Sequence, residues 1–267
     1  MHASILHILN KTKTRVQAFE TCKYSEGSGA EFKKRDFPAA VAGAKAQGRI
    51  PVIAEVKPAS PGRTFREISP EIAAELACEM EEAGAVAISV LTEPEIFQGS
   101  HKNLQRVRKT VCLPVLRKDF IIDESQLEEV ECDLILLIAG ILGKELGTFV
   151  ELAIEKGIEP LVEVHNKEEL DSALDTRTRV IGINNRNFET LKIELSVTEE
   201  LVPLVRKYDL EHGTKHLVIS ESGMNNPEDV RRAVRAGADA VLIGSALMES
   251  DSVFKKTKEF VQSSGWR

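Results

Sequence analysis

The chain has 267 residues, 42% of them hydrophobic and 29% charged, and a net charge of −7. It has enough apolar side chains for a substantial core, and its acidic balance argues against a nucleic-acid or anionic-membrane binder, which needs a basic face for phosphates. No run reaches the roughly 18 apolar residues of a membrane-spanning helix and no secretory signal is recognisable, so we expect a cytoplasmic protein.

Residues 1–50 are expected to form an N-terminal extension of the barrel, because they are too few to form a hydrophobic core of their own. Their first segment predicts an amphipathic helix. Residues 21–37 are polar and predict a loop, and residues 37–49 predict a second short helix that ends at Gly48. One side of the first helix carries Ile5, Ile8, Leu9 and Val16.

From residue 51 onward, short apolar runs alternate with helix-like segments. This alternation is typical of parallel strands covered by helices, and eight strands favour closure. We therefore predict an α/β fold, a single (β/α)8 TIM barrel over residues 51–267, close to the roughly 250 residues of that fold. No GxGxxG or GxxxxGK[ST] motif follows the first run, which disfavours a nucleotide-binding fold. The runs span residues 51–57, 85–93, 113–119, 133–139, 158–165, 179–186, 216–223 and 239–246.

Capping signals predict several helix boundaries. Ser69 followed by Pro70 begins a helix that ends at Gly84. Pro203 is expected to kink a later helix or end it early, because proline lacks a backbone N–H. The buried stripe of the helix after Ser69 is expected to hold Ile72, Leu76 and Met80. Capping boxes are predicted for Asp123 with Gln126, Asn166 with Glu169, and Ser196 with Glu199.

Almost every predicted strand ends in a polar residue, and in a barrel these ends meet at the face where active sites form. The first strand ends with Glu55 and Lys57. These two side chains point to the same side, because side chains alternate along a strand. A charged pair inside a barrel is costly unless its members bind each other or a ligand. A buried salt bridge is therefore the alternative to a catalytic role.

The third and fifth predicted strands end with Lys118 and Glu163. Lys118 lies on the side of Leu116, whereas Arg117 points the other way. Nearby cations and apolar walls should lower the pKa of Lys118, which suits a general acid or a Schiff-base nucleophile; the alternative is an exposed lysine. Aliphatic neighbours should raise the pKa of Glu163, which suits a general acid or base.

The sixth predicted strand ends with Asn184 and Arg186. Arg186 can bind a carboxylate through two parallel hydrogen bonds, and Asn184 can orient a hydroxyl or a catalytic side chain. Asn185 and Asn187 are interpreted as ordinary turn residues.

The last two predicted strands end with Ser222-Gly223 and Gly244-Ser245. Small residues let backbone N–H groups approach an anion, and the loops after strands seven and eight of such barrels commonly bind phosphate. We therefore expect a phosphate site here; the alternative is that the glycines only permit tight turns. Phe97, in the loop after the second strand, is a candidate wall for a flat ring, or else it only packs that loop.

The cysteines and histidines form no recognisable metal-binding pattern. The four cysteines include no CxxC pair, and the six histidines form no HxxxH or HExxH motif. We therefore predict neither a metal site nor a disulfide framework.

Seven motifs, in one order over roughly residues 48–250, together resemble the indole-3-glycerol phosphate synthase family: AEVKPASP, FQGS, LRKDF, LVEVH, IGINNRN, SESG and IGSALM. The resemblance implies conversion of 1-(2-carboxyphenylamino)-1-deoxyribulose 5-phosphate to indole-3-glycerol phosphate, carbon dioxide and water in tryptophan biosynthesis. It implies a phosphorylated small-molecule substrate and no metal or organic cofactor. It also implies that the N-terminal extension caps the catalytic face. We expect a monomer or a weak homo-oligomer.

The resemblance implies roles for individual residues. Lys118 resembles the general acid that protonates the ribulose carbonyl, and Glu163 the acid/base of dehydration and rearomatisation. Lys57, oriented by Glu55, resembles the lysine that holds the anthranilate carboxylate and protonates the departing hydroxide. The other matches are Asn184 and Ser222 as positioning groups, Arg186 and Ser60 at the carboxylate end, and Ser222, Gly223, Gly244 and Ser245 around the phosphate. Phe97 and Phe120 match the aromatic walls, and Glu221 matches a supporting carboxylate.

Gly62 departs from the family pattern, because Ser60-Pro61-Gly62 stands where the family often has Ser-Pro-Ser. Glycine should make this loop more mobile. Three other functions stay open. The barrel could be an enzyme that uses Lys118 as a Schiff-base lysine, as aldolases do. It could be a non-catalytic barrel that binds a phosphorylated metabolite. A phosphoribosylanthranilate isomerase fits less well, because Lys57 stands near the place of its cysteine.

Overall fold

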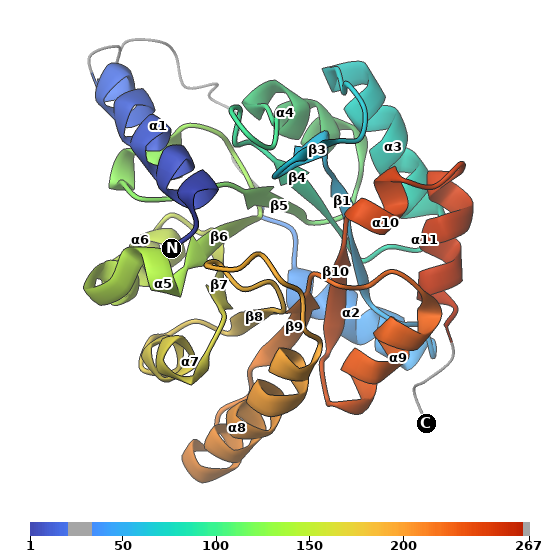
Figure 1. Ribbon diagram of the computed structural model, residues 1–267. Helices are drawn as coiled ribbons and strands as arrows, with labels where there is room; N and C mark the ends of the chain where they lie inside the picture. Colours follow the sequence, from blue (N-terminus) through green and yellow to red (C-terminus); the bar gives the residue numbers. More distant parts are fainter. Residues whose placement is uncertain (21–33, 264–267) are drawn as a thin grey trace.

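The computed structural model describes residues 1–20 and 34–263. Over these residues the chain folds as a closed barrel of eight parallel strands surrounded by helices (Figure 1). Each of the predicted runs contains one strand, so the predicted barrel is confirmed; most of the predicted loop 21–37 lies outside the described residues. In barrel order the strands are β1 (Val52–Val56), β10 (Ala240–Ile243), β9 (Leu217–Glu221), β8 (Val180–Asn184), β7 (Glu159–Val164), β6 (Leu134–Ile138), β5 (Val115–Lys118) and β4 (Ala87–Leu91).

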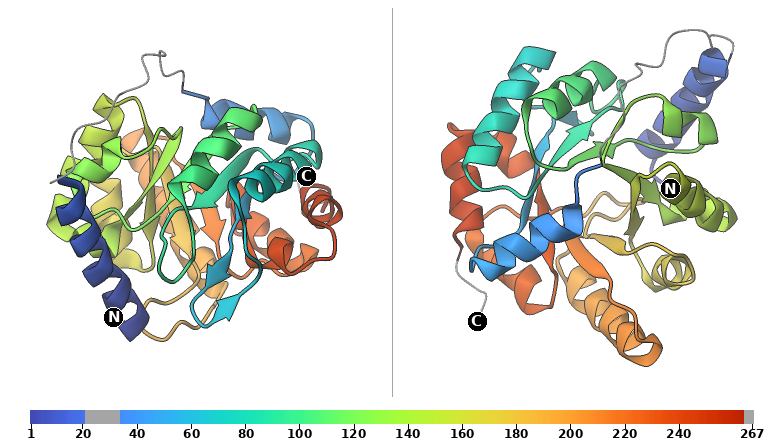
Figure 2. Two further views of the ribbon diagram at one scale, coloured as in Figure 1. Left: turned by 90° about the horizontal axis from the view of Figure 1, so that it is seen from above. Right: turned by 180° about the vertical axis from the view of Figure 1, so that it is seen from behind.

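Helices cover the outside of the barrel (Figures 1 and 2). The strands are buried on both faces, which explains their nearly continuous apolar sequences. In the part of the chain that the structure describes, no helix has the length and apolar character to cross a membrane. The helices are α3 (Pro70–Glu82), α4 (His101–Thr110), α5 (Ala139–Leu142), α6 (Leu146–Glu155), α7 (Lys167–Leu174), α8 (Ser196–His212), α9 (Pro227–Arg235), α10 (Ser245–Met248) and α11 (Val253–Val261), with the 3-10 turns η1 (Glu124–Glu128) and η2 (Gly143–Glu145).

The parallel register brings the polar strand ends to one mouth. Asn184 of β8 pairs with Glu221 of β9, and Glu163 of β7 pairs with Gly182 of β8. Since all eight strands run in the same direction, side chains at their carboxyl ends converge there.

The N-terminal extension is divided between the two ends of the barrel (Figure 2). Helix α1 (Ala3–Glu20) lies beside the mouth, where Ile5 lines the cavity described below. Helix α2 (Phe37–Ala46) lies at the opposite end, where Phe37 is fully buried in a cluster with Ile53 and Leu134. The implied cap over the catalytic face is therefore limited to α1, and α2 closes the other end with its apolar side.

Helix α3 begins as predicted, because the Ser69 hydroxyl accepts a hydrogen bond from the Ile72 N–H at 3.3 Å. Leu76 and Met80 are buried, but Ile72 is 39% exposed, so its predicted place on the buried stripe is wrong. Alanines at positions 73 and 77 complete that stripe, since they let the helix approach the strands closely.

The predicted capping box of α8 is wrong, and so is an early end at Pro203; a kink there stays a prediction. Ser196 is the first helical residue, following Leu195, and it provides no side-chain cap. The helix also continues through Pro203 to His212. Pro203 is exposed, so water can bind the carbonyl that the missing N–H leaves free, while buried Val202 and Val205 hold the helix against the barrel.

The other capping boxes differ between sites. Asp123 and Gln126 form one at η1. Asn166 accepts a hydrogen bond from the Glu169 N–H at 2.9 Å, but the Glu169 carboxylate accepts from the N–H of His165 instead of closing the box.

Gly62 lies in the turn of a small hairpin after β1. Its strands are β2 (Ala59–Ser60) and β3 (Arg63–Thr64). The φ of Gly62 is +76°, a conformation that glycine adopts without strain. Greater mobility of this loop stays a prediction.

Candidate active site

One cavity of about 370 Å³ opens at the carboxyl ends of the strands. Every residue that the sequence singled out for a site lines it. The predicted catalytic residues there are Glu55, Lys57, Lys118, Glu163, Asn184 and Ser222, and the predicted substrate-binding residues are Ser60, Phe97, Phe120, Arg186, Glu221, Gly223, Gly244 and Ser245. The strands thus bring together side chains that lie far apart in the sequence.

The centre of the cavity is a lysine between two carboxylates. The Lys118 Nζ lies 2.6 Å from Glu163 Oε2 and 3.1 Å from Glu221 Oε2. Its side chain is 14% exposed, so the alternative of an exposed strand-end lysine is wrong. The Asn184 amide donates a hydrogen bond to the other oxygen of Glu163 at 3.1 Å.

The pKa shifts of Lys118 and Glu163 are opposite to those predicted. Burial lowers the pKa of Lys118, but attraction from Glu163, Glu221 and Glu55 outweighs it and raises that pKa above its ordinary value. Burial raises the pKa of Glu163, but Lys118 and His165 outweigh it and hold that pKa well below its ordinary range. Burial and, for Lys118, neighbouring cations were the expected causes, whereas the fold supplies opposite charges within contact distance.

Glu221 is the carboxyl group that keeps its proton. Burial raises its pKa to about 8, and repulsion from Glu163 adds to this shift while Lys118 opposes it. Two carboxylates beside one ammonium cannot both be fully stabilised as anions. Near neutral pH the centre therefore holds a charged Lys118–Glu163 pair beside a largely protonated Glu221.

A second ion pair lies on β1, where Lys57 Nζ is 2.8 Å from Glu55 Oε2. The Ser89 hydroxyl donates to the other Glu55 oxygen at 3.2 Å. The sequence left open a buried salt bridge or a catalytic pair; the two residues form a salt bridge, and they line the cavity. Gly244 makes room for this pair, because a Cβ there would overlap the Glu55 carboxylate.

Asn185 is not a turn residue, so that interpretation is wrong. It is 1% exposed, and its amide nitrogen donates to the carbonyls of Glu221 and Ser222 at 2.9 and 3.0 Å. Its amide oxygen accepts from the Thr198 hydroxyl at 2.8 Å. Asn185 therefore joins β8, the end of β9 and α8. Asn187 does act in a turn, accepting from two backbone N–H groups.

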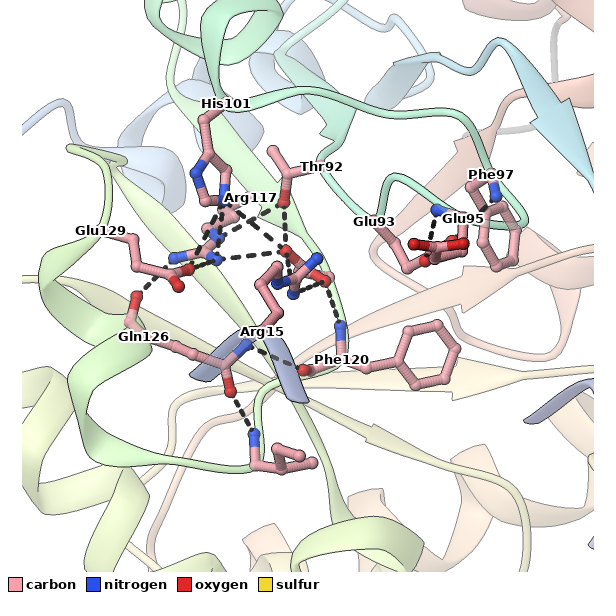
Figure 3. Close-up of polar contacts among 12 residues, drawn as sticks. Arg15, Thr92, Glu93, Glu95, Phe97, His101, Arg117, Phe120, Gln126 and Glu129 are labelled. Atoms are coloured by element: carbon pink, nitrogen blue, oxygen red, sulfur yellow. Dashed lines mark hydrogen bonds and ion pairs between the residues drawn. The ribbon is translucent and has the colours of Figure 1, made fainter. Parts of the chain in front are cut away.

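Two buried carboxylates support the aromatic wall of the cavity (Figure 3). Phe97 and Phe120 lie with ring centroids 6.2 Å apart. Glu93, 1% exposed, accepts hydrogen bonds from the N–H groups of residues 95, 96 and 97 at 2.7 to 2.9 Å. Asp119, also 1% exposed, accepts from the Phe120 N–H at 2.8 Å. Hydrogen bonds to the two carboxylates therefore fix the backbone that carries the two rings.

Arg117 points to the opposite side of β5 from Lys118, as predicted, and its guanidinium lies in a buried polar cluster (Figure 3). Its side chain is fully buried and lies 3.1 Å from Asp119 and 2.5 Å from Glu129. Arg15 of α1 binds the same Asp119 at 3.2 Å. Burial raises the pKa of Asp119, but contact with His101 and the charges of Arg117 and Arg15 hold it well below its ordinary range.

Two parts of the cavity lining differ in chemistry. Arg186 lines one part, where its backbone N–H donates to Asn184 Oδ1 at 3.0 Å and its guanidinium donates to the Leu191 carbonyl at 3.3 Å. Burial lowers the pKa of Arg186, and Glu55 partly offsets this. Ser222 and Gly223 both have positive φ, 65° and 89°, a left-handed turn at the end of β9. With Gly244 and Ser245 at the start of α10, they form the small-residue end of the cavity.

Sequence reasoning missed several residues that line the cavity or contact its lining. Arg63 lines the cavity and pairs with Glu249 at 2.6 Å, with no distinctive motif around it. Ile5 and Phe188 supply apolar wall from loops and from α1. His165 contacts Glu163, and its position in the LVEVH motif, two residues after Glu163, was a usable signal. In residues 1–20 and 34–263 no group of three or more acidic, His or Cys side chains is arranged to hold a metal ion.

Comparison with known proteins shows similarity along most of the chain. The family model described as indole-3-glycerol phosphate synthase matches residues 4–260. Relatives of that name include one from Methanocaldococcus jannaschii, 43% identical over 215 residues (79% of this chain and 77% of the relative). Another, from Shouchella clausii, is 48% identical over 207 residues (75% and 77%), and one from Aquifex aeolicus is 43% identical over 215 residues (79% and 80%).

Solved structures share the fold at much lower identity. An N-acetylmannosamine-6-phosphate 2-epimerase from Clostridium perfringens superposes with a TM-score of 0.57 at 16% identity, covering 82% of this chain and 93% of the other. A thiamine phosphate pyrophosphorylase from Pyrococcus furiosus gives 0.56 at 17% identity, covering 80% and 95%. These two likenesses concern the barrel alone.

Proposed function

Because the chain belongs to the indole-3-glycerol phosphate synthase family, we propose that Lys118, Glu163 and Lys57 carry out its ring closure. The enzyme is a carboxy-lyase of tryptophan biosynthesis with a phosphorylated small-molecule substrate. The observation that carries the assignment of roles is the convergence of these three side chains on one cavity, with Lys118 Nζ 2.6 Å from Glu163 Oε2.

Lys118 acts first, as the acid. The ring carbon that bears the carboxylate attacks the ribulose carbonyl, and Lys118 gives a proton to the carbonyl oxygen. The raised pKa of Lys118 keeps it a charged ammonium, able to stabilise the oxygen as negative charge develops there. Carbon dioxide then leaves, and its electron pair returns to the electron-deficient ring, which needs no base.

Glu163 and Lys57 complete the dehydration. Glu163, held as an anion by Lys118, removes a proton from the methylene carbon beside nitrogen. Lys57, paired with Glu55, binds the anthranilate carboxylate and protonates the departing hydroxide. Positioning by Asn184 and Ser222 brings the ring carbon and the carbonyl together, which supplies much of the acceleration.

The cavity suits a substrate that is anionic at both ends and aromatic in the middle. Arg186 and Ser60 bind the carboxylate end, and Ser222, Gly223, Gly244 and Ser245 surround the phosphate. Phe97 and Phe120 contact the ring, and Glu221 supports Lys118.

The test is the appearance of indole fluorescence when the purified protein meets 1-(2-carboxyphenylamino)-1-deoxyribulose 5-phosphate with no metal added. Lys118→Ala should lose nearly all turnover with substrate binding largely kept, and Glu163→Gln should be similarly impaired. Lys156→Ala, which removes a partly exposed lysine paired with Glu128, is the matched control and should leave turnover unchanged. Strong activity in Lys118→Ala or in Glu163→Gln would remove that residue from the mechanism.

A Schiff-base role for Lys118 is disfavoured on physical grounds. A nucleophilic amine must be neutral, and the carboxylates around Lys118 raise its pKa. Borohydride in the presence of substrate should therefore leave the mass of Lys118 peptides unchanged, and a trapped adduct would favour that route instead.

We further propose that residues 1–50 are an extension of the barrel rather than a domain, because α1 and α2 bury Ile8 and Phe37 against barrel residues. We also propose a monomer or a weak homo-oligomer that works in the cytoplasm. Sedimentation across a range of concentrations tests the oligomeric state.

A further inference from the structure

We propose that His165, held by Glu169, is a positioning residue that keeps Glu163 oriented and ready to act as the base. This inference rests on the proposed role of Glu163. The three side chains form a line of contacts: Glu163 Oε1 lies 3.3 Å from His165 Nε2, and His165 Nδ1 lies 2.9 Å from Glu169 Oε2. Neither His165 nor Glu169 matches a role that the family resemblance supplied.

The location of His165 follows from the strand and the helix beside it. His165 follows Val164, the last residue of β7, and its Nε2 lies against the Glu163 carboxylate. Helix α7 follows β7 along the chain (Figure 1). It places Glu169 in its first turn, within contact distance of the imidazole.

Glu169 is fixed rather than free to move. One of its oxygens also accepts from the His165 backbone N–H at 2.9 Å, and the other accepts from the Asn166 amide at 3.1 Å. Gly140 of α5 packs against the same carboxylate, where an added Cβ would be 2.6 Å from Glu169 Oε1. A held carboxylate of this kind fixes the ring orientation of the histidine it binds.

The imidazole is also confined on its face. The Phe188 ring packs against it with centroids 4.0 Å apart. Side-chain exposure rises along the line, from 1% for Glu163 to 8% for His165 and 20% for Glu169. Glu163 is thus bounded by Lys118 at one oxygen and by Asn184 and His165 at the other, which leaves little freedom in its carboxylate plane.

Electrostatics agrees with this geometry. Burial lowers the pKa of His165, but the nearby carboxylates of Glu163 and Glu169 outweigh it and raise that pKa to about 9. The charged groups around the line are Glu163 on β7, Glu169 on α7 and, across Glu163, Lys118 on β5. A positive imidazolium stabilises the anionic form of Glu163, which is the form that removes a proton.

The experiment is the pH profile of kcat/KM for His165→Phe, with His212→Phe as the matched control on the exposed side of α8. Removing the imidazolium should raise the apparent pKa of the base. The acidic limb of the profile should move up by about one pH unit, so that kcat/KM falls about 10-fold on that limb and recovers at higher pH. His212→Phe should superpose on the wild type. A purely structural role would lower activity equally at all pH values.

Two further variants keep the test decisive. His165→Gln retains a polar side chain and should show the same shift if His165→Phe does not fold. Glu169→Gln should lower the titration midpoint of the His165 ring, followed by NMR, toward the ordinary histidine value of about 6.5.

The outcomes separate the two proposals. If Glu163→Gln is inactive but the His165→Phe profile superposes on that of the wild type, or if Glu169→Gln leaves the His165 titration unchanged, the inference about His165 is wrong and the role of Glu163 stands. Full turnover in Glu163→Gln would overturn the role of Glu163 and this inference with it.

Discussion

Arg117 and Lys118 are neighbours in β5, and their side chains point to opposite sides of the barrel wall. Lys118 reaches the cavity, while the guanidinium of Arg117 is fully buried outside it, 3.1 Å from Asp119. Asp119 in turn holds the backbone of Phe120. A buried cluster of charged side chains, on the side of β5 away from the cavity, thus fixes the strand end that carries Lys118.

Replacing Arg117 by Met should destabilise the protein strongly, because Asp119 and Glu129 would lose a buried positive partner. We expect the free energy of unfolding to fall by roughly 3–5 kcal/mol. Urea denaturation measures it. Arg177→Met breaks an ion pair whose arginine is 72% exposed, and it should change little. Equal losses in the two variants would contradict the importance of the buried cluster.

Gly182→Ala should disturb both stability and turnover. A Cβ at this position would overlap the Glu221 carboxyl group and come within 2.7 Å of Leu161. Overpacking of this kind costs about 1–3 kcal/mol, and displacing Glu221 should also slow turnover through Lys118. Gly147 lies in α6 with open space around it, so Gly147→Ala should be neutral or slightly stabilising. A fully active, fully stable Gly182→Ala would show that Glu221 can move freely.

Glu221→Gln should change how stability depends on pH. The folded-state pKa of Glu221 is raised to about 8, so between about pH 4.5 and pH 8 the folded protein keeps a proton that the unfolded chain releases. This contribution to stability is fully present below the unfolded pKa and is lost as pH rises through the folded pKa. Glutamine does not titrate, so the variant should gain stability relative to the wild type from pH 5 to pH 8. Urea midpoints at several pH values measure this, with exposed Glu145→Gln as control; parallel curves would refute the shift.

Glu93→Gln should weaken substrate binding more than it slows chemistry. The carboxylate accepts three backbone N–H groups in the loop that carries Phe97, and a glutamine NH₂ would face those donors. If the disturbed loop weakens substrate binding by about 1.4 kcal/mol, KM rises about 10-fold. We expect kcat to change less. Steady-state kinetics measure both. Glu95→Gln, at an exposed position of the same loop, should behave as the wild type.

The sequence by itself determined the barrel and which side chains at a strand end share a side. Both follow from local periodicity: apolar runs separated by capped helices predict the strands, and alternation along β1 predicts that Glu55 and Lys57 share a side. For the same reason the opposite directions of Arg117 and Lys118 could be predicted. The residues expected in a site do line one cavity, because parallel strands must end together.

Only the tertiary structure decided the charge states and the supports of the site. The pKa of Lys118 depends on Glu163 and Glu221, which other strands deliver, so burial predicted the wrong sign. Asn185 resembled a turn residue, yet its partner Ser222 follows β9 and its partner Thr198 lies in α8. The division of the extension between α1 and α2 likewise depends on which barrel end each helix meets. Sequence periodicity determines the side of its own strand or helix from which a side chain points. Its charge state and its hydrogen-bond partners depend on groups that the fold brings next to it.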